Sequence, residues 1–60
     1  MNETLVERMK RVRKEKKLTM FELALRLRVP EGMISRLEKG KVPPTSQQAD
    51  IIRAFLAGKI

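Results

Sequence analysis

Residues 18–40 constrain the fold of this chain more than any other stretch, because they predict two short helices joined by a tight turn. Thr19, followed three residues later by Glu22, has the spacing of a capping box. A helix is therefore expected over about residues 20–28. Apolar residues lie on nearly every side of this helix, and a 60-residue protein cannot bury all sides of it, so part of its apolar surface should face outward.

The turn and the second helix have their own signals. Pro30 drives the residue before it out of the helical conformation and is well tolerated in the first turn of a helix. Gly40 suits the left-handed position that follows a helix. These residues predict a second helix over about 31–39.

One further helix is expected on each side. The first covers about residues 4–16, with Asn2 or Thr4 as its N-cap, and the last covers about 46–57, after a capping box that starts at Thr45. The apolar side chains expected to point inward are Leu5, Met9, Val12, Leu23, Ala24, Leu27, Val29, Ile34, Leu37, Ala49, Ile52, Phe55 and Leu56. The sequence therefore predicts an all-α protein.

The chain is strongly basic, with a net charge of +7 over 60 residues and an isoelectric point near 10.6. This balance favours a polyanionic partner. Seven of the ten residues from Arg8 to Lys17 are lysine or arginine. They form either an ordinary solvated helix face, with cations favoured by the helix dipole, or a flank that faces phosphates.

Length and composition argue against several classes of protein. Sixty residues suffice for one domain with a thin core. The chain has no cysteine, so it lacks disulfides and thiolate metal sites, and no histidine, the usual general base. It shows no phosphate-cradling glycine loop and no paired carboxylates, so we expect no enzyme activity, metal or cofactor. The N-terminus is no signal peptide and no apolar run could span a membrane, so a cytoplasmic protein is expected.

A family resemblance is carried by Leu18, Thr19, Glu22, Leu23, Ala24, Leu27, Val29, Ile34, Ser35, Arg36, Leu37, Glu38, Gly40 and Pro44. This pattern is similar to that of the phage repressor/Cro-type helix-turn-helix family, also called the XRE family. The resemblance spans roughly residues 5–57. It implies a compact, lambda-repressor-like bundle of four or five helices, with the third in the major groove of DNA. It also implies a structural ion pair between Arg13 and Glu38.

The same resemblance implies a sequence-specific transcriptional regulator whose partner is double-stranded DNA. The residues that it places at the DNA are Thr19, Met20, Glu31, Gly32, Met33, Ser35, Arg36, Lys39 and Lys41. Arg36 resembles a base-reading position, and its fork of donors suits guanine. The helix N-terminus at Thr19 and the two lysines after the second motif helix resemble phosphate contacts.

Several positions depart from the family pattern. Lys17 and Arg28 stand where glycine is usual, so either a left-handed side chain costs on the order of 1 kcal/mol or the turn is built differently. Met20 replaces a glutamine that holds the DNA backbone, and Glu-Gly-Met at residues 31–33 replaces the usual polar readers. The scaffold therefore resembles a DNA reader, whereas its reading face has few base-reading groups.

Two explanations for this reading face stay open. Either specificity is narrow and rests on Met33, Ser35 and Arg36, or the module mainly contacts a protein, as an antitoxin-like or transcription-machinery-binding domain. Phe21 and Leu25, an i, i+4 pair, either form an exposed contact for such a partner or fold over neighbouring side chains. Because the segment that often builds the family's dimer is short or missing, we expect a monomer or weak dimer in solution, with a homodimer on DNA left open.

Overall fold

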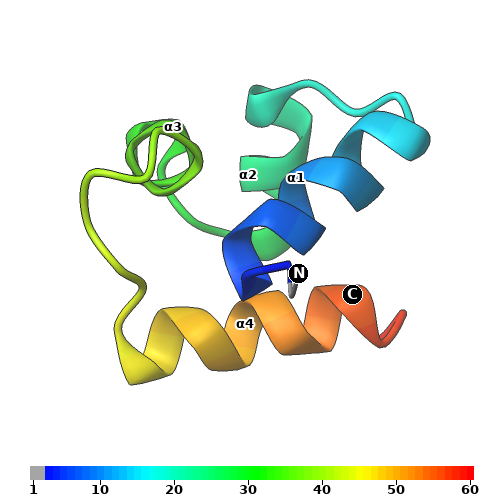
Figure 1. Cartoon of the computed structure of the whole chain (residues 1–60). Helices are drawn as coiled ribbons and strands as arrows, with labels where there is room; N and C mark the ends of the chain where they lie inside the picture. The colour runs from blue at the N-terminus through cyan, green and yellow to red at the C-terminus, as the bar shows by residue number, and fades with distance from the viewer. Residues whose placement is uncertain (1–2) are drawn as a thin grey trace.

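Four helices are present in residues 3–60, the part of the chain that the computed structural model describes. They are α1 (Leu5–Glu15), α2 (Met20–Leu27), α3 (Glu31–Glu38) and α4 (Ser46–Leu56) (Figure 1). The prediction of an all-α fold is confirmed. The expected helix spans run slightly too long, because they include residues that cap the helices: Thr4, Lys16, Arg28, Lys39 and Ala57.

Three helices begin with a capping box, formed by Thr4 with Glu7, Thr19 with Glu22, and Thr45 with Gln48. In the box of α2, Thr19 Oγ1 accepts a 3.0 Å hydrogen bond from the Glu22 N–H, and the Glu22 carboxylate accepts a 2.8 Å bond from the Thr19 N–H. The alternative cap of α1, Asn2, lies outside the described residues. Pro30 occupies the N-cap of α3 and, lacking a polar side chain, makes no side-chain hydrogen bond there.

A left-handed residue follows every helix: Lys17 (φ 59°), Arg28 (φ 59°), Gly40 (φ 72°) and Gly58 (φ 77°). After α1, the Lys17 and Leu18 N–H groups donate to the carbonyls of Lys14 and Arg13, which is the Schellman pattern. The Arg28 and Val29 N–H groups repeat this pattern after α2. Lys17 and Arg28 therefore adopt the left-handed conformation that glycine usually takes at these positions, and the steric strain of their Cβ atoms destabilises the fold.

We expect Lys17→Gly and Arg28→Gly each to raise the free energy of unfolding by about 1 kcal/mol, because glycine adopts positive φ without a clash of its Cβ. Urea unfolding of each variant measures the gain. The matched control is Lys16→Gly, since Lys16 lies at φ −83° and has no strain to relieve. That variant should lose about 0.5–1 kcal/mol. A loss at Lys17 as large as that at Lys16 would contradict the strain argument.

The core consists of eight buried apolar side chains drawn from all four helices: Met9, Leu23, Ala24, Leu27, Ile34, Leu37, Ile52 and Phe55. All eight were expected to point inward. The other expected core residues are only half-buried, and these are Leu5, Val12, Val29, Ala49 and Leu56. A domain this small has too little interior to enclose them fully. Within residues 3–60, every buried side-chain nitrogen and oxygen has a hydrogen-bond partner.

The helices pack in a fixed order in space. α2 packs against α3, and α1 packs against both α3 and α4. Figure 1 shows α4 along one side of the molecule and the α2–α3 pair on the other, with α1 between them. α3 thus packs mainly against α2 and α1, and its contact with α4 is at most slight. None of the described helices has the length and apolar character needed to cross a membrane.

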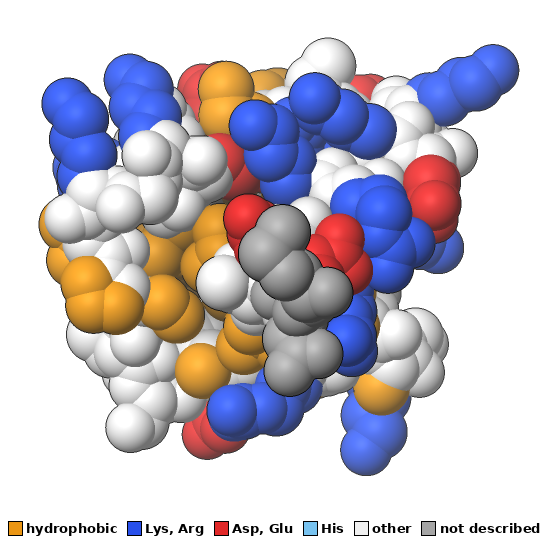
Figure 2. All heavy atoms as spheres, in the orientation of Figure 1, with side chains coloured by type: hydrophobic (Ala, Val, Ile, Leu, Met, Phe, Trp, Pro, Cys, Tyr) orange, Lys and Arg blue, Asp and Glu red, His pale blue; other side chains and the backbone are white. Residues whose placement is uncertain are grey.

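A shallow apolar groove of about 530 Å³ lies between the start of α1 and the segment that joins α3 to α4. Apolar side chains gather over this region in Figure 2, and those that line the groove are Leu5, Val6, Leu37, Val42, Pro43 and Pro44. Its two acids already have internal partners, since Glu7 caps α1 and Glu38 binds Arg13. The groove is therefore lined mostly by apolar side chains, and Lys39 is its cationic side chain.

Candidate nucleic-acid interface

α3 is anchored by one face and presents the other to solvent. Ile34 and Leu37 hold the inner face in the core, at 0% and 3% exposure. Glu31, Gly32 and Arg36 are exposed. The packing of the inner face thus sets which side of α3 a ligand can reach, and Arg36 is the long cationic side chain on that side.

The remaining expected DNA contacts differ in accessibility. Lys39 and Lys41 are exposed just beyond α3. Met20 and Met33 are half-buried and pack against the core, so part of each side chain serves packing. Ser35 is half-buried as well. Of the polar and charged side chains expected to read bases, Arg36 and Glu31 are thus the most accessible.

The N-terminus of α2 offers one backbone donor where a contact was expected, at Met20, and a second at Phe21. Thr19 was expected to contact phosphate, but its N–H and one lone pair of its Oγ1 are used by the capping box. The N–H groups of Met20 and Phe21 have no acceptor within residues 3–60. An anion at this helix end would therefore meet the amides of residues 20 and 21. Sequence reasoning missed the Phe21 amide, although counting the donors that a capping box uses could have found it.

The arginines of α1 and α4 are paired with carboxylates, whereas those of the helix-turn-helix segment, residues 20–38, have no such partner within residues 3–60. Four arginines lie close to a carboxylate, and they are Arg8, Arg11, Arg13 and Arg53. In the described part of the chain, Arg26, Arg28 and Arg36 have no such partner, and all three belong to this segment. The arginines without a carboxylate partner thus lie on the segment that the resemblance associates with DNA binding, although only Arg36 was among the expected contacts.

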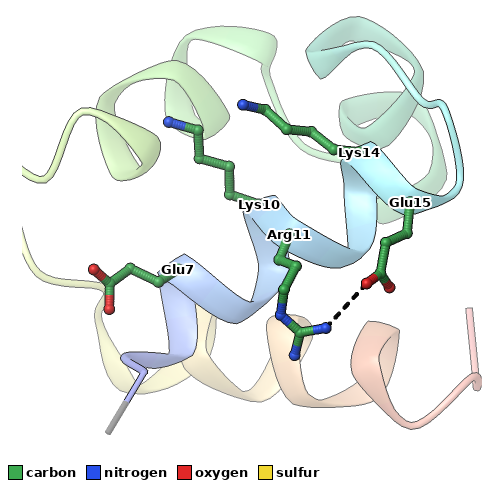
Figure 3. A pocket seen from close by; sticks show the side chains of 5 residues that line it. All are labelled: Glu7, Lys10, Arg11, Lys14 and Glu15. Atoms are coloured by element: carbon green, nitrogen blue, oxygen red, sulfur yellow. Dashed lines mark hydrogen bonds and ion pairs between the residues drawn. The ribbon is translucent and has the colours of Figure 1, made fainter. Parts of the chain in front are cut away.

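The basic run on α1 is divided between two sides of the helix. Arg11 donates hydrogen bonds of 3.0 and 3.1 Å to Glu3 and one of 3.2 Å to Glu15. The hydrogen-bonded Arg11 guanidinium holds the pKa of the Glu3 carboxyl below its ordinary value. Figure 3 shows Lys10 and Lys14 extending away from the Arg11–Glu15 pair. One side of α1 is therefore locally neutralised, and the other carries these two lysines.

Arg13 and Glu38, the residues for which the resemblance implies an ion pair, are joined by two hydrogen bonds. Arg13 Nε and Nη2 donate to the Glu38 carboxylate at 2.8 and 3.0 Å, and Nη1 donates to the Leu18 carbonyl at 2.8 Å. The side chains are only 11% and 6% exposed. One arginine therefore links α1, the turn before α2 and the end of α3, and so helps to fix the position of α3.

Phe21 and Leu25 form an exposed apolar pair on α2. They are 55% and 63% exposed, so they do not fold over neighbouring side chains. Met20, one residue before Phe21, is instead packed against the core. The outward apolar surface of α2 is thus smaller than the sequence alone suggests.

A three-residue turn joins α2 to α3, and α3 is displayed at the surface of a small all-α core. This arrangement defines a helix-turn-helix protein. The family model described as Helix-turn-helix matches residues 9–59, and the chain belongs to this Cro/C1-type family, also called the XRE family. The family is one of DNA-binding regulators. No curated protein and no solved structure matches the chain.

Proposed function

We propose that the protein is a transcriptional regulator that binds specific sequences of double-stranded DNA through α3 in the major groove. The observation that carries the proposal is the state of Arg36: it is exposed on the outer face of an anchored helix and has no carboxylate partner within residues 3–60. A guanidinium fork with unused donors suits the O6 and N7 acceptors of guanine.

Affinity for the DNA backbone would come from groups that follow α3 and from the start of α2. Lys39 and Lys41 follow the helix and are exposed, and the amides of Met20 and Phe21 at the start of α2 have no acceptor within residues 3–60. Such contacts position a protein on the duplex and make its affinity fall steeply with salt. Dimerisation on DNA belongs to the same proposal, and a two-fold repeat in the bound sequences would identify it.

Arg36→Ala should remove a guanine preference at one position and weaken binding to the selected sequence by about 5- to 150-fold. The measurement is selection from a randomised duplex pool at two salt concentrations, followed by titration of the recovered sequence. Arg53→Ala is the matched control, since it removes the same charge from α4, and we expect it to keep the motif. Weak, motif-free binding that disappears at higher salt would show that the basic charge supplies only background affinity.

A second candidate function, a module that mainly binds another protein, is favoured by the exposure of Phe21 and Leu25. These side chains are the large apolar groups that α2 leaves in water. The same selection separates the two candidates, because a protein-directed module should return no motif that depends on Arg36. Loss of a partner complex in the Phe21→Ala, Leu25→Ala variant, with DNA binding unchanged, would then support the second candidate.

A further inference from the structure

We propose that Gly32 is a positioning residue for Arg36, because its lack of a side chain leaves the first turn of α3 open for the Arg36 guanidinium. The inference rests on the proposed function above and adds the residue that directs the reader. It also predicts where the contacted base lies: opposite the first turn of α3, where the Arg36 guanidinium is held, and not opposite the Arg36 Cα atom.

The geometry places the two residues together. A Cβ atom at Gly32 would lie 3.7 Å from Nη1 of Arg36. Arg36 is four residues further along α3, and long helical side chains lean towards the helix N-terminus over the preceding turn. The guanidinium therefore lies over residue 32. An alanine methyl group would make an ordinary contact there, whereas a longer side chain would compete for the same space.

Backbone conformation gives no other reason for glycine at this position. The described glycines with positive φ are Gly40 and Gly58, so Gly32 does not need the freedom that glycine provides. Glycine also weakens a helix interior relative to alanine. What Gly32 supplies is open space, and the Arg36 guanidinium is the side chain that lies beside that space.

The surroundings define the chemistry that the positioned guanidinium would meet. The N–H groups of Glu31 and Gly32 have no acceptor within residues 3–60, so the first turn of α3 presents donors next to the guanidinium. A base edge with two acceptors complements such a surface, and guanine presents N7 and O6 in the major groove. Guanine opposite this turn is therefore the preferred base.

The test compares Gly32→Leu with Gly32→Ala. Alanine and leucine favour helix nearly equally, so both variants gain helix propensity and differ mainly in the space they fill. Each is carried through the randomised-duplex selection in the wild-type background and in the Arg36→Ala background. We expect Gly32→Ala to keep the guanine preference and Gly32→Leu to reduce it roughly tenfold or more. Gly32→Leu should reduce it no further once Arg36 is absent.

The outcomes separate this inference from the proposed function. If Arg36→Ala abolishes the guanine preference but Gly32→Leu leaves it intact, the inference about Gly32 is wrong. The proposed contact between Arg36 and guanine is then still supported. The inference is also overturned if Gly32→Leu weakens binding to all sequences equally and leaves the guanine preference unchanged. In that case Gly32 only leaves space for the DNA. A wild-type protein without an Arg36-dependent preference overturns both ideas.

Discussion

Phe55→Ala is expected to remove a large part of the free energy of unfolding of the protein. Phe55 is the largest fully buried side chain, at 2% exposure, and lies on α4, the helix that packs against α1. Truncating a buried phenylalanine to alanine costs about 3–5 kcal/mol. A domain of this length has only about 3–9 kcal/mol of stability in total. A urea titration monitored by circular dichroism measures the loss in the free energy of unfolding.

The other phenylalanine of the chain provides the control. Phe21→Ala is the same chemical change at a side chain that is 55% exposed. We expect it to alter the free energy of unfolding by no more than about 0.5 kcal/mol. If Phe21→Ala lowers the free energy of unfolding as much as Phe55→Ala does, Phe21 is packed in solution. The assignment of Phe21 and Leu25 as an exposed apolar pair would then be wrong.

Glu38→Leu is expected to cost about 3–5 kcal/mol, because it leaves the guanidinium of Arg13 almost buried without its charged acceptor. Arg13→Met alone should be similarly damaging, since it strands the Glu38 carboxylate. The unfolding free energies are best measured in the Lys17→Gly, Arg28→Gly background, where the added stability keeps the variants folded.

The double variant Arg13→Met, Glu38→Leu separates pairing from burial. Replacing both partners by apolar groups removes the stranded charge, so most of the loss should be recovered. A residual cost of about 1–3 kcal/mol is expected, because the Leu18 carbonyl also loses the hydrogen bond from Arg13. Losses that simply add in the double variant would show that the two side chains act independently.

The helices could be predicted because their signals are local. A capping box joins residues three apart, and a left-handed residue ends a helix through bonds to the turn just before it. Thr19 with Glu22, Thr45 with Gln48, and Gly40 therefore identify helix ends from sequence, and the structure agrees at each. The eight buried core residues follow from helical periodicity for the same reason.

The candidate site was predictable only in part. Its proposed location follows from the pattern of residues 18–40 and from the family resemblance. The family match confirms the family, and the individual DNA contacts stay predictions. The accessibility of single groups does not follow, because it depends on contacts between distant residues. The packing of Met20 and Met33 against the core and the pairing of Arg11 with Glu3 are examples.

By itself, the sequence determined four helices, a helix-turn-helix arrangement, a basic surface and the residues of a small core, because each of these depends on neighbours along the chain. Only the tertiary structure decided how far single side chains on α2 and α3, such as Phe21, Leu25 and Met33, are exposed. It likewise decided which arginines have no carboxylate partner within residues 3–60. It also decided how the Arg36 guanidinium lies over Gly32. Burial and charge pairing join residues that are far apart in the chain, as Arg13 and Glu38 are, so the packed fold must exist before either is defined.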